Sequence, residues 1–236
     1  MIKQITCYGD SGIICDFGDE VKKEINIKVI ALFKILQQKI INQEIKGIKN
    51  CIPSYNKLII FFDLTYTTSK KIISFVESIV KEQVNSFSEN KQWMIPVCYD
   101  KEFGIDQQRV ADYTKLSIDT ILEKHLNTTF YIYMLGFAPG FPYMGDLENE
   151  LYCPRLKTPR VKINRGSVII AENFCAIYPY DSPGGWNILG NTPIELFNQD
   201  SSNPSLFSPG DTVKFYQISK DEHQKFSMKE FLRNAS

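Results

Sequence analysis

The sequence has few of the features on which common enzymes and surface-binding proteins depend. Its 236 residues include only two histidines, which nearly excludes a histidine-rich metal site or a histidine-dependent triad. Lysine plus arginine and aspartate plus glutamate balance at 27 each, so the basic excess of a nucleic-acid or anionic-membrane surface is missing. No apolar run approaches the roughly 18–20 residues of a membrane span, and the first residues do not resemble a signal peptide. We therefore expect a cytoplasmic protein that binds neither nucleic acid nor membrane.

Standard catalytic and metal-binding motifs are also missing. The six cysteines are scattered and form no CxxC pair, so we expect buried free thiols and no metal in this chain. The sequence contains no GxxxxGK(S/T) loop, no GxGxxG after a strand, no GxSxG elbow and no HExxH. ATP binding through a P-loop is thereby excluded, and no generic motif assigns an activity.

The first 90 residues have the pattern of an α+β domain. Amphipathic helices are predicted over 21–41 and from 67–69 onward, because apolar residues recur there with a 3.6-residue period. Strands are predicted at 2–7, 12–17, 48–54 and 57–62. This order predicts an α/β sandwich with helices on one face of a sheet. Since no catalytic motif falls here, a structural or docking role is favoured.

The polar stretch 85–92 predicts a boundary between a domain of residues 1–90 and a second domain of residues 91–236. The second domain begins with a strand and two short helices, the later one capped by Ser117. Short strands are then predicted at 129–135, 167–171, 174–178, 186–190, 194–197 and 212–217. Their spacing predicts a closed or nearly closed β-barrel, and the polar final residues predict a loosely packed tail.

Glycine, proline and aromatic residues concentrate in the second domain. Residues 130–215 contain eight of the 13 glycines and nine of the 11 prolines. Phe137, Phe141, Tyr143 and Trp186 lie among them, and they could line a pocket, form a protein-binding patch or fill the barrel ends as core. The flanking glycines and prolines favour stiff surface loops.

Two sets of side chains are candidates for chemistry. His125 could act as a general base or hydrogen-bond a substrate, although its place near a helix end favours an interaction with the helix dipole. Arg155, Arg160, Lys162 and Arg165 lie within eleven residues and could bind a carboxylate or phosphate. The alternative for this basic cluster is a solvated loop.

Several segments resemble a known family. His125 is followed by YMLGFAPGFPYMGDL at 133–147, PRLKTPR at 154–160, SPGGW at 182–186, LGNTP at 189–193 and PGDTVKF at 209–215. These segments resemble the B subunit of bacterial ATP-dependent 5-oxoprolinase, whose family also contains the kinase inhibitor KipI and proteins named allophanate hydrolase subunit 1. The resemblance extends over nearly the whole chain.

The resemblance implies an N-terminal α+β domain followed by a cyclophilin-like β-barrel. It implies a hydrolase that opens the lactam of 5-oxoproline to L-glutamate with ATP, as a heteromer of this chain with subunits A and C. ATP is needed because a lactam is resonance-stabilised, and phosphorylation of its oxygen makes the ring carbon an activated electrophile. Without a P-loop, ATP would bind at an unusual site or on the partner subunits.

The resemblance also implies which residues form the site. His125, Arg155 and Arg160 would bind and polarise the substrate. The loops that shape the substrate site would contribute Phe137, Pro139, Gly140, Phe141, Tyr143, Ser182, Gly184, Gly185 and Trp186. The family usually has GGQTG where this chain has ENFCA at 172–176, so Phe174 replaces an amide that could hydrogen-bond a lactam.

Two alternatives follow from the same family. A KipI-like inhibitor of a sensor histidine kinase would use the retained aromatic loops for binding and would not need the altered residues 172–176. A subunit of an allophanate or urea-related amidohydrolase ranks lowest, because the chain lacks a serine-rich amidase signature.

Overall fold

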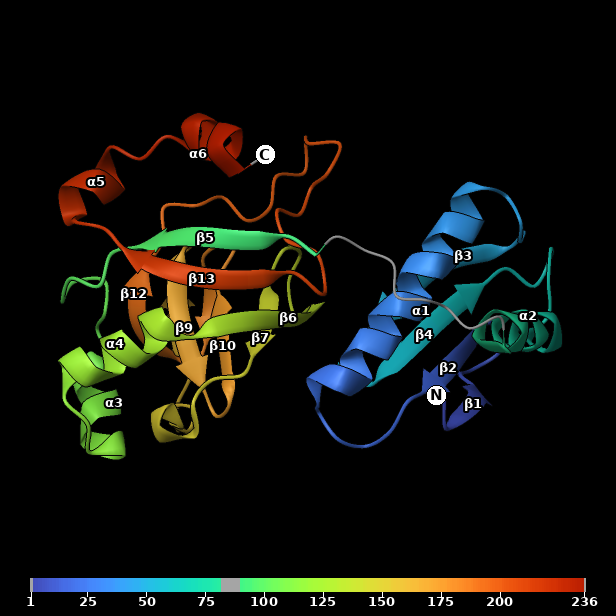
Figure 1. The fold of residues 1–236 in the computed structure, drawn as a ribbon, viewed down its shortest axis with the longest axis horizontal. Coiled ribbons are helices and arrows are strands. Elements are labelled where there is room, and N and C mark those ends of the chain that lie inside the picture. The colour runs from blue at the N-terminus through green and yellow to red at the C-terminus, as the bar shows by residue number, and fades with distance from the viewer. Residues whose placement is uncertain (1, 82–89, 236) are drawn as a thin grey trace. The chain divides into compact units, whose positions relative to one another are not determined.

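The computed structural model describes residues 2–81 and 90–235 (Figure 1). Its internal contacts divide the chain into two compact units, Met1–Glu89 and Asn90–Ser236. The predicted boundary at 85–92 lies mainly in residues 82–89, outside the described residues. Each unit has its own buried apolar core.

The N-terminal unit is a four-stranded antiparallel sheet in the order β1-β2-β4-β3. Ile13 and Ile60 of the sheet pack with Leu36 of one helix and Val76 of the other in a single cluster, so both helices cover the same face. The elements are β1 (Gln4–Cys7), β2 (Gly12–Asp16), α1 (Lys23–Ile41), β3 (Ile48–Pro53), β4 (Lys57–Phe62) and α2 (Ser69–Lys81). The predicted order of strands and helices is confirmed.

The second unit contains a seven-stranded, nearly closed barrel in the order β12-β9-β10-β7-β6-β13-β5. Its edges meet where Cys98, directly after β5, exchanges two backbone hydrogen bonds of 2.9 Å with Asn191 of β12. Neighbouring strands are antiparallel except β13 and β5. The strands are β5 (Gln92–Val97), β6 (Thr129–Leu135), β7 (Pro142–Gly145), β9 (Ser167–Ala171), β10 (Phe174–Ile177), β12 (Asn187–Asn191) and β13 (Thr212–Gln217).

Further elements surround the barrel. They are α3 (Gln107–Thr114), α4 (Ile118–Asn127), a 3-10 helix (Asn149–Leu151), the paired strands β8 (Arg160–Ile163) and β11 (Ser182–Gly184), α5 (Lys220–Gln224) and α6 (Met228–Ala235). The N-cap predicted for α4 is confirmed, since the Ser117 side chain accepts a hydrogen bond from the backbone N–H of Thr120. The strand predicted at 194–197 is wrong, because only an isolated bridge from Phe197 to Ser205 forms there.

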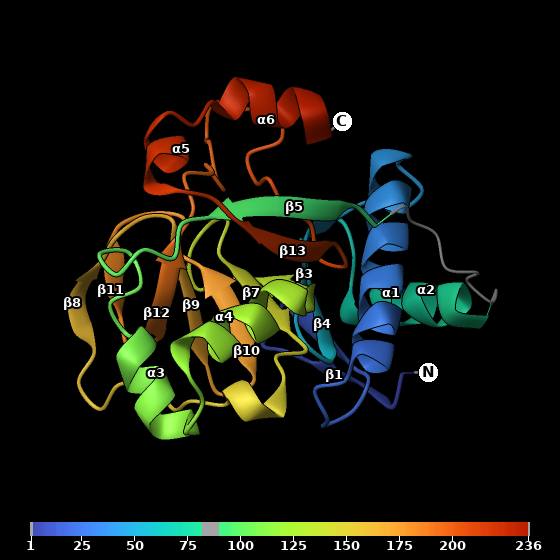
Figure 2. The ribbon, with the colours of Figure 1, turned by 60° about the vertical axis from the view of Figure 1, so that its left-hand side comes forward.

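The C-terminal segment packs on the barrel, so the expected loosely packed tail is wrong. Figures 1 and 2 both show α5 and α6, in red, beside β5. Phe226, Met228 and Phe231 contact the barrel core, and the Phe231 ring stacks on Trp93 at a centroid distance of 6.3 Å. These apolar side chains, together with the Lys220–Glu102 ion pair, join this polar segment to the rest of the unit.

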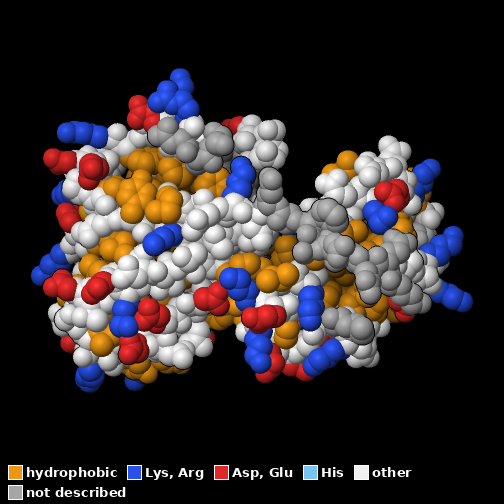
Figure 3. Space-filling model, viewed as in Figure 1, with side chains coloured by type: hydrophobic (Ala, Val, Ile, Leu, Met, Phe, Trp, Pro, Cys, Tyr) orange, Lys and Arg blue, Asp and Glu red, His pale blue; other side chains and the backbone are white. Residues whose placement is uncertain are grey.

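The surface carries mixed charge. On the face shown in Figure 3, lysine and arginine side chains are interspersed with aspartate and glutamate. None of the helices in the described parts of the chain is long and apolar enough to cross a bilayer. Within the same parts, no group of three or more His, Cys, Asp or Glu side chains is placed to hold a metal.

Asp211 joins the C-terminal part of the barrel to the first barrel strand, so its loss should destabilise the protein. This 4% exposed residue accepts hydrogen bonds of 3.0 Å from Trp93 Nε1 and from the backbone N–H groups of Lys91 and Ser208. Asp211→Ala leaves three donors unpaired and should lower the free energy of unfolding by about 2–3 kcal/mol in urea denaturation. The exposed control Asp200→Ala should change it by less than about 0.5 kcal/mol, and equal effects would contradict the anchoring role.

Candidate functional site

A second buried apolar cluster lies on the outer side of the barrel wall. Successive side chains of a strand point to opposite faces, so Ile170 and Cys175 lie in the barrel interior whereas Ile169 and Ala176 face outward. We call the outward set the outer cluster. It consists of Phe141, Ile163, Ile169, Ala171, Ala176, Tyr178, Trp186 and Ile188, with Ala138, Tyr143 and Phe174 packed against it.

Phe141 is the centre of an aromatic group within the outer cluster. This ring is 1% exposed and lies 5.0 Å from Tyr143, 5.3 Å from Tyr178 and 6.2 Å from Trp186, centroid to centroid. Phe137 lies 5.3 Å from Phe141 but is 66% exposed. Tilted and edge-on contacts of this kind are favourable for aromatic rings. The cluster therefore has a buried aromatic floor and one exposed ring at its rim.

The turn between β6 and β7 places Phe137 at this rim. Phe137 has φ 65°, a left-handed conformation that non-glycine residues adopt rarely. Gly140 has φ 79°, and a Cβ there would lie 2.7 Å from the Cβ of Phe197. The hydroxyl of Tyr180 donates to the carbonyl of Pro139 and closes the turn. The GFAPGF segment is thus a fixed support that presents one aromatic ring.

The SPGGW segment forms another side of the outer cluster. A Cβ on Gly184 would lie 1.8 Å from the hydroxyl oxygen of Tyr178, so this glycine makes room for a buried phenol. The carbonyl of Gly185 accepts a 2.7 Å hydrogen bond from the backbone N–H of Leu156, which ties the PRLKTPR segment to this turn. Among the described side chains, the Ser182 hydroxyl oxygen is buried and has no hydrogen-bond partner.

Arg155 lies at the edge of the outer cluster. Its guanidinium carbon is 5.4 Å from the centre of the Trp186 ring, and its side chain is 56% exposed. Its Nε lies 3.9 Å from the Glu172 carboxylate, a loose pair between two half-exposed groups. Burial raises the pKa of Tyr143, and the positive charge of Arg155 opposes that shift. The arrangement offers a cation beside aromatic faces, which suits a carboxylate joined to a flat ring.

Arg160 has a different environment although it comes from the same basic segment. Its Nη2 lies 2.5 Å from Asp106 Oδ1, and Asp106 is buried at the start of α3. The other carboxylate oxygen of Asp106 accepts a 2.8 Å hydrogen bond from the backbone N–H of Ile188. This ion pair joins β8, α3 and β12, and the charge of Arg160 is compensated within the protein.

His125 lies on the inner side of the barrel wall. The residue is 0% exposed, its Nδ1 is 2.9 Å from the Tyr99 hydroxyl, and its ring stacks on Phe215 at 4.7 Å. Burial lowers the pKa of His125 to about 3, so the ring is neutral at physiological pH. His125 and Arg155 are therefore separated by the sheet, and the structure does not bring them together.

The predicted loop residues come together, whereas the predicted catalytic residues do not. Phe137, Phe141, Tyr143 and Trp186 form one group, and the prolines and glycines assigned to the site support it. Tyr178 is absent from the predicted site residues, although it lies in an outward position one residue after the inward Ile177. Asp106 is also absent, and the sequence holds no signal for it because its partner is 54 residues away.

The fold and the site define a class of protein: a small α+β unit followed by a barrel unit with an aromatic surface edged by arginine. The chain belongs to the family described as the carboxyltransferase domain, subdomain C and D, which matches residues 3–207.

Several known proteins are similar to this chain. The B subunit of 5-oxoprolinase from Bacillus subtilis (strain 168) is 36% identical over 235 residues, covering 94% of this chain and 96% of that protein. The crystal structure of TTHA0988 superposes with a TM-score of 0.78 at 29% identity and covers 88% of this chain. This chain spans 40% of the TTHA0988 chain. Urea amidolyase of Lachancea kluyveri is 33% identical over 178 residues, which are 70% of this chain and 10% of that enzyme.

These matches confirm the resemblance to the B subunit of 5-oxoprolinase that the sequence motifs predict, and urea amidolyase fits the wider allophanate-related family. The reaction, the use of ATP, subunits A and C, and inhibition of a sensor kinase stay predictions for this chain. The same holds for the roles assigned to His125, Arg155 and Arg160.

The two glycines of SPGGW give a matched pair for testing the outer cluster. Gly184→Ala forces the buried phenol of Tyr178 to move and should lower the free energy of unfolding by about 1–3 kcal/mol. Gly185→Ala meets only ordinary contacts, the nearest at 3.6 Å, and should change stability by less than about 0.5 kcal/mol. Urea denaturation measures both, and a harmless Gly184→Ala would contradict the packing described.

The burial of His125 predicts acid sensitivity. The unfolded chain binds a proton at this histidine below about pH 6.5, whereas the folded chain does so only near pH 3. Stability should therefore fall as pH decreases from 6.5 towards 3, by up to about 1.4 kcal/mol per pH unit from this residue. His125→Gln should show a shallower dependence in denaturation curves recorded at several pH values. Identical slopes would show that the folded protein takes up the proton easily.

Proposed function

We propose that this chain is the B subunit of a cytoplasmic ATP-dependent 5-oxoprolinase and acts with subunits A and C. Support comes from the 36% identity to the B subunit of 5-oxoprolinase from Bacillus subtilis over nearly the full length of both chains. The seven-stranded barrel agrees with the cyclophilin-like barrel that the resemblance implies. The observation that carries the proposal is the half-exposed guanidinium of Arg155 beside the face of Trp186.

The outer cluster matches the chemistry of 5-oxoproline. The substrate is a flat five-membered lactam that carries a carboxylate. Arg155 would pair with the carboxylate, and the exposed Phe137 would cover the ring. Phe174 lies beside the outer cluster where the family has an amide, so contacts to the lactam N–H and oxygen would come from backbone groups or from a partner subunit.

The role of ATP would be to activate the lactam by phosphorylation. The lactam oxygen attacks the γ-phosphorus and displaces ADP, and water then adds to the ring carbon that bears the phosphorylated oxygen. Ring opening leaves an acyl phosphate, which a second water cleaves to glutamate and phosphate. Since the sequence has no P-loop, partner subunits would supply most of the contacts to the nucleotide.

Arg155 provides the decisive test in the assembled enzyme. Arg155→Gln should lower kcat/KM for 5-oxoproline by about 10–100-fold, because it removes a charged hydrogen-bond partner of the substrate. The readout is formation of glutamate and ADP by the purified chain together with its own subunits A and C. Lys157→Gln, which removes an exposed charge two residues away, is the matched control and should keep wild-type kinetics.

Complex formation is measured on the same variants by gel filtration. The proposal requires that Arg155→Gln assembles like the wild type while it loses activity. Equal kinetics for Arg155→Gln and Lys157→Gln would exclude this substrate site. Inactivity of the wild-type chain with both partners present would exclude the proposed function itself.

A further inference from the structure

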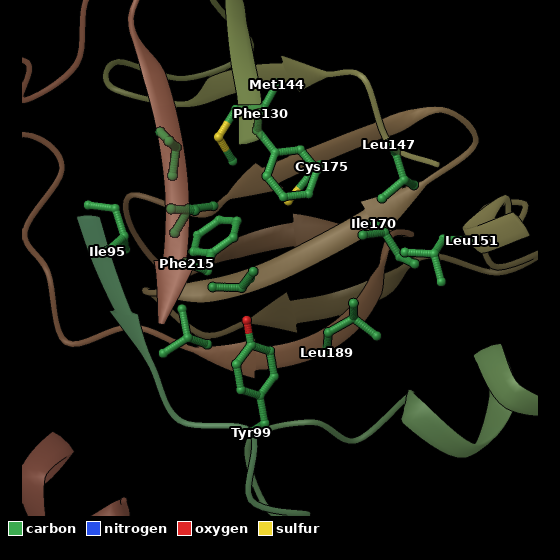
Figure 4. Packing of buried hydrophobic residues seen from close by; sticks show 14 of the residues in the cluster. Ile95, Tyr99, Phe130, Met144, Leu147, Leu151, Ile170, Cys175, Leu189 and Phe215 are labelled. Carbon is green, nitrogen blue, oxygen red and sulfur yellow. The ribbon is translucent and has the colours of Figure 1, made fainter. Parts of the chain in front are cut away.

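A chain of three polar side chains crosses the interior of the barrel. The Tyr99 hydroxyl lies 2.9 Å from His125 Nδ1, and Cys175 Sγ lies 3.5 Å from His125 Nε2. Figure 4 shows Tyr99 with its hydroxyl directed into the barrel, among the apolar side chains that surround Cys175 and Phe215. Each of the three residues is at most 4% exposed. Both ring nitrogens of His125 are thus occupied by protein groups.

The three groups are uncharged at neutral pH. Burial lowers the pKa of His125, and burial raises the pKa values of the Tyr99 hydroxyl and the Cys175 thiol well above their usual range. The rings of Phe130 and Phe215 lie against the imidazole, at centroid distances of 5.2 Å and 4.7 Å. A neutral imidazole donates from one nitrogen and accepts at the other, so it can satisfy both neighbours at once.

The end of the chain of polar groups lies directly behind the outer cluster. Cys175 is the residue of β10 that pairs in register with Met144 of β7. Its neighbour Ala176 belongs to the outer cluster, and Tyr143, the neighbour of Met144, packs against that cluster. A shift of Cys175 would therefore displace β10, which leads directly into Tyr178 of the aromatic floor and pairs with β7, the strand that carries Tyr143. The opposite end, Tyr99, follows the Cys98–Asn191 pairing that closes the barrel.

We propose that Tyr99, His125 and Cys175 hold β10 in place behind the outer cluster, and that His125 is a positioning residue for this site instead of a general base. A general base must reach the reacting proton by a hydrogen bond or through one water. His125 faces the barrel interior, with its two nitrogens engaged. The effect on turnover rests on the proposed function, whereas the effect on the outer cluster does not.

The structural part is tested by fluorine NMR of the full chain labelled with 5-fluorotryptophan. The sequence has two tryptophans, Trp93 and Trp186, and Trp93→Phe assigns the two signals. Tyr99→Phe and Cys175→Ala each remove one hydrogen bond and should shift or broaden the Trp186 signal. Cys175→Ser keeps a donor and acceptor at that position and should restore the wild-type signal.

Ile95→Val is the control for a general loss of core packing. This residue lies in the same interior core, on β5, and does not belong to the chain of polar groups. Its substitution should slightly lower the urea concentration at the unfolding midpoint and leave the Trp186 signal unchanged. An unchanged Trp186 signal in folded Tyr99→Phe and Cys175→Ala would overturn the proposal, and so would an equal shift in Ile95→Val.

Nitrogen-15 NMR of labelled histidine tests the state of the ring in the wild-type protein. The His125 signals should be those of a neutral ring at every pH from 5 to 8, and a titration within that range would overturn the proposal. In the three-subunit assay, Cys175→Ala and Tyr99→Phe should lower kcat about tenfold with an unchanged pH profile. A base would instead give a loss of about 10²–10⁴-fold in His125→Gln alone, with one limb of the pH profile removed. If the wild type has no activity, the proposed function fails and the NMR results still decide the positioning role.

Discussion

The structure of the second unit depends on one constraint: the barrel strands β9, β10 and β12 are buried on both faces. Because side chains alternate along a strand, β9 sends Val168 and Ile170 into the barrel and Ile169 and Ala171 into the outer cluster. Each large apolar side chain buried in this way contributes about 1.5–3 kcal/mol. The interior core and the outer cluster thus lie on opposite faces of the same strands, β9 and β10.

The barrel wall contains residues 174–176, part of the run 172–176 for which the family resemblance implies other side chains. Phe174 and Ala176 face the outer cluster, whereas Cys175 between them faces His125 in the interior. A substitution in this run therefore affects either the outer cluster or the barrel interior, depending on the face on which the residue lies. The outer face carries the aromatic side chain of Phe174, where the family resemblance implies an amide, and the inner face carries the Cys175 thiol beside His125. The substrate chemistry proposed for this family member depends on the outer face.

The two arginines of the PRLKTPR segment, Arg155 and Arg160, have different charge environments. Arg160 is compensated by a buried carboxylate and joins three elements of the unit, so its loss would leave Asp106 buried and unpaired. Arg155, five residues earlier, has only a loose partner in Glu172 and lies on an aromatic face. Both residues are arginines that follow a proline in the same segment. Their different surroundings make Arg160 part of a structural ion pair and leave Arg155 accessible to a ligand.

The sequence by itself determined the longer strands and helices, because each shows a pattern over several neighbouring residues. It also determined where the glycine- and proline-rich loops lie. The strands β4, β6, β9 and β13 have the predicted bounds, because an apolar run bounded by turn residues is a property of neighbouring residues. The strands β7, β8 and β11 are too short for such a pattern. The family resemblance implied that the GFAPGF and SPGGW segments shape one site, and in the structure Phe141 and Trp186 of these segments lie in one cluster. Tertiary structure alone decided that His125 lies in the core, that Arg160 is paired and that the tail helices are attached. Those outcomes depend on solvent exposure and on partners up to 54 residues away, which a local pattern does not contain.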